Sequence, residues 1–190
     1  CQIVSAGSTT VVMQTILQAL TRADSNSEVR VEGGTHNGMA PSVDFTEQWF
    51  FPQLTRAGAR IESVLEQHGF YPNGGGAWKV LITPWCDRQA IVLTGRGAAV
   101  ERRAVVKSSA IKADVAVREL DKIKKRLHWR DDEMEAVRVS SPGPGNIVSL
   151  RLAFANVTEV FEAVGVLGVS AERVAGRAIS GLKRYLCGDS

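Results

Sequence analysis

The sequence Glu32-Gly33-Gly34-Thr35-His36-Asn37-Gly38-Met39-Ala40-Pro41-Ser42-Val43-Asp44-Phe45 decides the fold, because it joins a strand to a helix. Residues 28–31, just before it, alternate polar and apolar side chains, which predicts a strand. Residues 43–57 predict a helix with Ser42 at its N-cap. The glycines between them allow turns that a side chain would forbid. Such a connection can hold a phosphate or a flat ring at the helix N-terminus, although an ordinary tight turn explains the same pattern.

Two further segments, one on each side of this stretch, extend the pattern. Residues 6–15 read Ala-Gly-Ser-Thr-Thr-Val-Val-Met-Gln-Thr, and residues 68–76 read His-Gly-Phe-Tyr-Pro-Asn-Gly-Gly-Gly. In this order and spacing, the three segments closely resemble the RNA 3'-terminal phosphate cyclase family. The resemblance covers nearly the whole chain, continuing through Gly143–Asn146, Val169–Val174 and Lys183–Leu186. One departure is Gly38, which stands where many members have proline, so this loop should be looser than usual.

The resemblance implies an α+β fold in two parts. Residues 1–97 would hold about one repeat of a large domain whose repeats are similar to the C-terminal domain of translation initiation factor 3. Enolpyruvyl transferases share that repeated fold. Residues 98–187 would form a small inserted α/β domain with a thioredoxin-like arrangement, and residues 188–190 would begin the return to the large domain.

The hydrophobic pattern itself predicts helices packed on one face of a sheet in the first part. A helix over residues 8–19 should turn Val12, Ile16 and Leu20 towards a core. Pro52 should kink the helix that follows the central stretch, or end its regular bonding. Further strands are predicted at 60–66, 78–83 and near Ile91; the second part should contain strands at 98–108, 135–139, 148–154 and 157–164, with helices at 111–128 and after Ser170.

Composition and charge fit a folded chain with a modest basic excess. The chain has 190 residues, 44% of them hydrophobic, which is enough for one domain or two small ones. Its formal net charge is +3, and residues 96–138 are the most basic region, with 12 basic and 8 acidic side chains. That excess could help to hold a polyanion, but a solvated helix face explains it better.

The cysteines and the ends of the chain indicate a cellular compartment and a fragment of a longer protein. The three cysteines, Cys1, Cys86 and Cys187, are widely spaced and contain no CxxC pair. This argues against a disulfide framework, a zinc site or a redox role, and fits a reducing cytoplasm. No apolar run is long enough to span a bilayer. The chain begins without methionine and the family extends beyond both of its ends, so we interpret it as an internal fragment.

The resemblance also implies an activity for the intact protein. Family members use ATP to convert an RNA 3'-phosphate into a 2',3'-cyclic phosphate. A histidine first takes AMP, which then passes to the terminal phosphate and leaves when the neighbouring 2'-OH attacks. A divalent cation, Mg²⁺ or Mn²⁺, would offset the charge of the polyphosphate. The expected partner is therefore RNA with a 3'-terminal phosphate.

Two residues of this chain take functional roles from the resemblance. The family's matching glutamine contacts the bound nucleotide, which assigns that role to Gln14, and its matching proline packs on adenine, which assigns that role to Pro41. No catalytic residue and no metal ligand are assigned. The chain's histidines, His36, His68 and His128, do not match the family's nucleophile motif, so this piece alone should be inactive.

Three alternatives stay open at this stage. A cyclase-like ribosome-assembly scaffold would keep the fold and lack the nucleophilic histidine, which lies outside this sequence. An enolpyruvyl transferase would share the repeated fold but would not predict the inserted domain or the roles of Gln14 and Pro41. A generic basic RNA-binding domain is supported only by the charge of residues 96–138. The RNA substrate, the preferred metal and the oligomeric state are not encoded in any pattern that we recognise.

Overall fold

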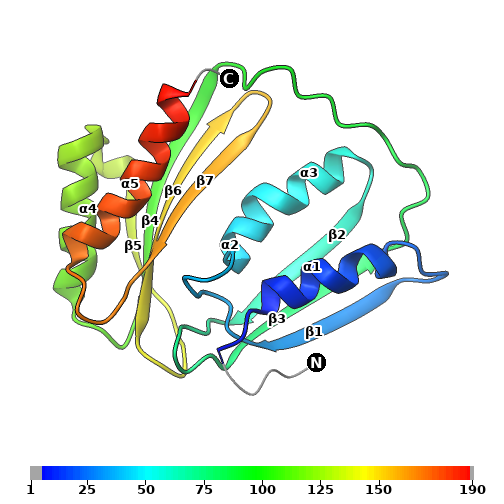
Figure 1. Cartoon of the computed structure of the whole chain (residues 1–190), viewed down its shortest axis with the longest axis horizontal. Helices are drawn as coiled ribbons and strands as arrows, with labels where there is room; N and C mark the ends of the chain where they lie inside the picture. Colours follow the sequence, from blue (N-terminus) through cyan, green and yellow to red (C-terminus); the bar gives the residue numbers. More distant parts are fainter. Residues whose placement is uncertain (1–5, 189–190) are drawn as a thin grey trace. The chain divides into compact units, whose positions relative to one another are not determined.

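Two compact α+β units make up the protein in a computed structural model that describes residues 6–188 (Figure 1). The first unit runs to Val92 and includes Ser140–Gly143. The second consists of Leu93–Val139 and the chain from Pro144 onwards. Cys1 and residues 189–190, where a return to the large domain is expected, lie outside the described residues.

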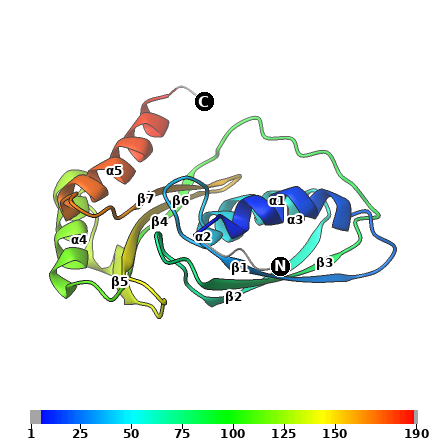
Figure 2. The same cartoon turned by 60° about the horizontal axis from the view of Figure 1, so that its bottom comes forward.

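The first unit is a three-stranded antiparallel sheet with helices on one side (Figure 2). The strand order is β1-β3-β2, so the last strand in sequence lies in the middle. This agrees with the predicted series of helix, strand, helix, strand and strand. The elements are α1 (Thr9–Leu20), β1 (Ser27–Gly33), α2 (Val43–Phe45), α3 (Phe51–Arg56), β2 (Arg60–Gln67) and β3 (Gly76–Thr83).

The helix after the central stretch changes its winding before a proline. Ser42 caps it as predicted, because its hydroxyl accepts a hydrogen bond from the amide of Phe45 at 2.9 Å. Between α2 and α3, residues 46–50 form a π-helical segment. Pro52 follows in the first turn of α3; proline lacks the amide hydrogen and crowds the carbonyl four residues earlier. The predicted break in regular bonding at Pro52 is therefore confirmed.

On helix α1, the buried side chains lie one residue away from the predicted positions. Met13 and Leu17 are buried, whereas the predicted positions 12, 16 and 20 are only partly buried and pack at the rim. Trp78, at the centre of β3, is fully buried and its ring stacks on Phe51 of α3. The buried cluster contains residues of the helices and of strands β1 and β3: Met13, Leu17, Val31, Val43, Phe51, Trp78, Val80 and Ile82.

The strand predicted near Ile91 is absent, and this prediction was wrong. Residues 84–98 form no strand, and Ile91 is exposed. A β-branched run becomes a strand only when a neighbouring strand supplies hydrogen bonds, and none does so here within the described residues. The start of this segment is instead held by Trp85, whose backbone amide donates to Thr21 at 2.8 Å and whose indole donates to Ala57 at 3.0 Å.

The second unit is a mixed four-stranded sheet in the order β5-β4-β6-β7. Strands β4 and β5 are parallel, and the other two pairs are antiparallel. A βαβ unit is thus followed by a hairpin and a final helix, as predicted. The elements are β4 (Ala99–Ser109), α4 (Ala113–Leu127), β5 (Met134–Arg138), β6 (Gly145–Phe154), β7 (Thr158–Val164) and α5 (Ala171–Cys187), with a short 3₁₀ turn at Asp131–Glu133.

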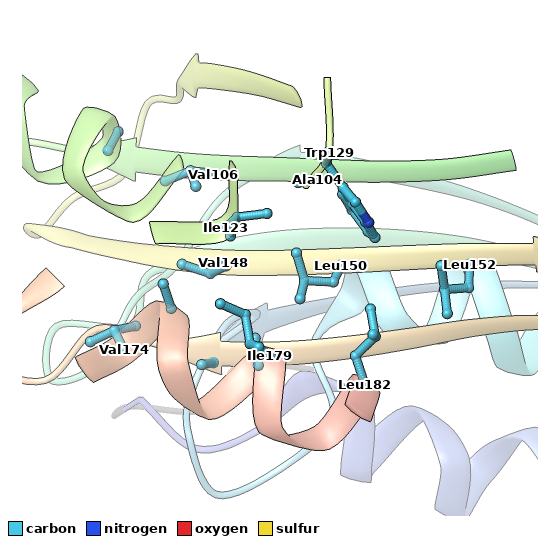
Figure 3. Packing of buried hydrophobic residues seen from close by; sticks show 14 residues of the cluster. Ala104, Val106, Ile123, Trp129, Val148, Leu150, Leu152, Val174, Ile179 and Leu182 are labelled. Atoms are coloured by element: carbon cyan, nitrogen blue, oxygen red, sulfur yellow. The ribbon is translucent and has the colours of Figure 1, made fainter. Parts of the chain in front are cut away.

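One helical layer covers this sheet and builds its core (Figure 3). Side chains of α5, including Val174, Ile179 and Leu182, point towards apolar residues of β6. Leu150 of β6 and Ile123 of α4 are both fully buried. Among the described helices, none combines the length and the apolar character that a membrane crossing requires.

Candidate functional site

The two glycine-rich segments of the first unit form a single structure. The backbone amides of Thr35 and His36 both donate to the carbonyl of Gly69, at 3.0 and 3.1 Å. The amide of Gly69 donates in return to the hydroxyl of Thr35 at 2.8 Å, and His36 pairs with Phe70 in a short parallel bridge. The turn after β1 and the turn before β3 therefore brace each other.

Several glycines are required by this contact. A Cβ on Gly69 would lie 2.6 Å from the carbonyl oxygen of Gly33 and would clash with the amide nitrogen of Gly76. A Cβ on Gly76 would lie 2.6 Å from a methyl carbon of Thr35, and one on Gly34 would overlap the carbonyl of Ala6. Backbones approach more closely here than any side chain permits. These glycines thus serve packing.

His36 is a structural residue of this arrangement. Its side chain is fully buried, and its Nδ1 lies 2.7 Å from the hydroxyl of Thr35. Its Nε2 lies 3.3 Å from Oδ2 of Asp44 without the alignment of a hydrogen bond. The ring stacks on His68, with 5.1 Å between centroids. These contacts show that His36 helps to hold the two turns together.

The loop between β1 and α2 leaves this structure and returns to it. The amide of Val43 donates to the carbonyl of Thr35 at 3.0 Å, which closes the base of the loop. At its tip, Met39 and Pro41 are exposed, and a Cβ on Gly38 would meet nothing within 4 Å. The base of the loop is therefore held by backbone hydrogen bonds, and its tip is exposed.

Pro41 is held against α1 by a chain of hydrogen bonds. The hydroxyl of Thr10 donates to the carbonyl oxygen of Pro41 at 2.7 Å. A carbonyl only accepts, so the single proton of Thr10 is used there, and Thr10 must accept from Ser8, whose hydroxyl is 2.7 Å away. Ser8 in turn accepts from the amide of Val11 at 3.2 Å, as the N-cap of α1. The chain therefore runs in one direction, from the helix cap to the loop.

Gln14 lies next along the same helix. It is four residues after Thr10, and side chains at that spacing share one face of an α-helix, with Cβ atoms about 5–6 Å apart. Gln14 is partly exposed, whereas Thr10 is buried. The carbonyl of Pro41 thus contacts α1 through Thr10, and Gln14 lies one turn further along the same helix.

This region offers the exposed apolar ring of Pro41 and the amide side chain of Gln14, which suit a heterocyclic base better than a metal. No cluster of three or more metal-ligating side chains occurs within residues 6–188. An open groove of about 530 Å³ lies elsewhere in the first unit and includes neither Gln14 nor Pro41. It is lined by Glu47, Phe51, Pro52, Thr55, Ile61 and Ser63.

The sequence did not reveal Thr10 as a residue of the site. Ser8 and Thr10 belong to the segment that carries the resemblance, and the start of α1 was predicted there. The contact from Thr10 to Pro41 spans 31 residues, and no local periodicity encodes a pairing at that distance. Only the capping position of Ser8 could have drawn attention to this turn.

Comparison with known proteins places the chain. The family model for RNA 3'-terminal phosphate cyclase matches residues 1–169. The chain is 40% identical over 183 residues to the "RNA 3'-terminal phosphate cyclase" of Ectopseudomonas mendocina, covering 96% of this chain and 53% of that protein. It is 42% identical over 183 residues to the protein of that name in Pseudomonas fluorescens, with the same coverage.

A third relative of the same name, from Salmonella typhimurium, is 40% identical over 183 residues, with 96% of this chain and 53% of the relative covered. The chain thus spans about half the length of the curated relatives it matches. The match to the family model runs through both units. The chain belongs to the RNA 3'-terminal phosphate cyclase family.

Proposed function

We propose that the protein to which this chain belongs is an ATP-dependent RNA 3'-terminal phosphate cyclase, which converts an RNA 3'-phosphate into a 2',3'-cyclic phosphate. Family membership supports this, since the family model matches residues 1–169 and several relatives carry that name. A scaffold without catalysis has no specific observation in its favour. The cytoplasm is the proposed location, because the cysteines are few and widely spaced and, of those in the described residues, Cys86 and Cys187 are free.

The chemistry requires an activated phosphate. A terminal phosphate monoester is a poor electrophile because its oxygens are poor leaving groups. Transfer of AMP from ATP to a histidine, with release of pyrophosphate, and then to the RNA phosphate creates a leaving group. The 2'-OH attacks that phosphorus, the ring closes and AMP departs. The nucleophilic histidine would lie outside this chain, and Mg²⁺ or Mn²⁺ would offset the charge of the triphosphate.

The part of this chain in the reaction is to hold the nucleotide. Adenine would pack on the exposed ring of Pro41, and Gln14 would donate or accept a hydrogen bond beside it. The observation that carries this proposal is the 2.7 Å hydrogen bond from Thr10 to the carbonyl of Pro41. It fixes the loop against the helix that bears Gln14, so both side chains can meet one ligand.

For each of the two units we also propose a specific fold. The first unit would be about one repeat of the kind seen in the C-terminal domain of initiation factor 3, within residues 1–97. The second, residues 98–187, would be an inserted thioredoxin-like domain. Its order β5-β4-β6-β7, with a parallel pair beside two antiparallel ones, supports that comparison.

Adenylylation by ATP tests the proposed function directly. The whole protein is incubated with ATP labelled at the α-phosphate, denatured and separated by electrophoresis. We expect label on the protein, stable to denaturation, because AMP is covalently attached. A correctly folded whole protein that acquires no label and does not cyclise an RNA 3'-phosphate would favour the scaffold.

Thr10→Val tests the nucleotide site. Valine keeps the shape of threonine but cannot donate to Pro41, so the loop loses its link to α1 and the carbonyl loses its partner. We expect the dissociation constant of ATP for the whole protein, measured by calorimetry, to rise about tenfold.

The matched control is Thr15→Val on the same helix. The hydroxyl of Thr15 is exposed and donates only to Val11, one turn back within α1. It should leave ATP affinity within about twofold. Equal effects of the two substitutions would remove the argument that Thr10 positions the loop.

A further inference from the structure

Helix α5 contains several basic side chains and few acidic ones. After Glu172 its sequence contains four basic side chains, at positions 173, 177, 183 and 184, and no acidic one. Val174, Ile179 and Leu182 point into the core of the second unit (Figure 3). At 100° per residue, Arg173, Arg177 and Arg184 fall opposite that buried stripe, and all three are exposed.

Helix α4 lies beside α5 and runs in the same direction. Strands β4 and β7 are each antiparallel to β6 and therefore parallel to each other, and each of the two helices returns from one of these strands. Arg118 of α4 forms a bidentate ion pair with Glu172 of α5, at 2.7 and 2.8 Å. That pair joins the two helices near the start of each.

Beyond this pair the helical layer is almost purely cationic. Lys124 is paired with Asp131, and Asp121 is the exposed carboxylate of the later turns of α4. The remaining cations of the two helices make no ion pair with any described residue, and we call them the cation face. They are Lys122, Lys125, Arg126, Arg173, Arg177, Lys183 and Arg184.

We propose that the cation face binds the phosphodiester backbone of the RNA substrate. This rests on the proposed function only in taking RNA as the partner. Arg173 and Arg177 are about 6 Å apart along α5, and Arg184 is about 10 Å further on, so the row contacts an extended polyanion. Guanidinium groups bind phosphate through two parallel hydrogen bonds. The contacts read no base, and they position the strand.

The composition of the face favours a nucleic acid over an anionic membrane. A helix that lies on a membrane buries an apolar stripe in the lipid. The apolar stripe of α5 is already used inside the unit, because Val174, Ala178 and Leu182 are buried. Around Arg173, Arg177 and Arg184 the outward side of α5 therefore presents charge, which suits a hydrated phosphate backbone.

The salt dependence of RNA binding tests this proposal. Binding of the 190-residue chain to a fluorescent 20-nucleotide RNA with a 3'-hydroxyl is followed by anisotropy between about 50 and about 300 mM KCl. Over this range the screening of charges by salt increases strongly. In the triple variant Arg173→Gln, Arg177→Gln, Arg184→Gln, we expect the slope of log K against log salt to fall by about 2. Affinity at 0.1 M salt should fall about tenfold or more.

Two control variants separate charge at this face from charge in general. Arg22→Gln, Arg56→Gln, Arg60→Gln removes the same charge from exposed positions of the first unit and should leave the slope unchanged. Lysine at positions 173, 177 and 184 keeps the charge and should keep most of the slope. Far-UV circular dichroism checks that each variant is folded.

The outcomes distinguish this inference from the proposed function. An unchanged slope in the glutamine variant, or binding to phosphatidylserine vesicles in place of RNA, overturns the cation face as an RNA site. Adenylylation of the whole protein by ATP needs no RNA, so its absence together with a reduced slope would count against the cyclase proposal alone. Normal adenylylation with an unchanged slope would count against the cation face alone.

Discussion

Replacing Gly69 with alanine is expected to lower the free energy of unfolding of the first unit by more than about 3 kcal/mol. The new methyl group would lie 2.6 Å from the carbonyl oxygen of Gly33 and would overlap the backbone of Gly76. Backbone atoms of two braced turns cannot move aside as a flexible side chain does. Urea unfolding, followed by tryptophan fluorescence, measures the change, because three of the four tryptophans lie in this unit.

Gly38→Ala is the matched control for that experiment. A Cβ at Gly38 meets nothing within 4 Å, and its φ is not among the positive ones that strain an L-residue. Alanine restricts the unfolded chain, so this variant should gain about 0.5 kcal/mol. Equal losses of stability in the two variants would show that the close approach around Gly69 is not what demands glycine.

Glu119 gives rise to the second large effect. It is fully buried between α4 and β6, where one carboxyl oxygen accepts from the amide of Asn146 at 2.6 Å. The other oxygen has no hydrogen-bond partner among the described residues. Burial raises the pKa of the Glu119 carboxyl to about 7, helped by Glu172 of α5 and opposed by Asn146 and by Arg118. The native protein therefore keeps a proton that the unfolded chain releases near pH 4.5.

The stability of the second unit should therefore fall as the pH rises from about 4.5 to 7. In that range the folded state binds more protons than the unfolded state, so the free energy of unfolding declines with pH. The full decline is up to about 3 kcal/mol for a raised pKa of this size. Glu119→Gln cannot ionise and keeps an oxygen for Asn146. We expect its stability to show no such decline and to exceed that of the original protein at pH 8, measured by denaturant unfolding at several pH values.

Asp121→Asn provides the comparison two residues further along α4. It removes one carboxylate from an exposed position and should not abolish the decline. If the original protein and Glu119→Gln depend on pH in the same way, Glu119 is not the group that carries the proton.

Local signals predicted most of the fold. Ser42 was expected at a helix N-cap, Pro52 as a break in the helix, and the turn over residues 68–76 between two strands; each is present. These features depend on neighbours within a few residues, so the sequence displays them directly. The prediction of a strand near Ile91 failed for the opposite reason, because a strand depends on a partner strand that is often remote in sequence.

The residues of the candidate site come from the resemblance, whereas the contacts that hold them come only from the structure. The resemblance supplied Gln14 and Pro41, while the hydrogen bond that ties Pro41 to α1 comes from Thr10, across 31 residues. Likewise, the burial of His36 against Asp44 and His68 follows only from how two distant turns meet. Contacts of long range leave no period in the sequence.

The chain of hydrogen bonds from the amide of Val11 through the hydroxyls of Ser8 and Thr10 to the carbonyl of Pro41 has a thermodynamic consequence. Each link polarises the next, so order at one end is shared with the other. A ligand that immobilises the ring of Pro41 will therefore also stabilise the first turn of α1, and fraying of that turn will, by reciprocity, weaken the binding of the ligand.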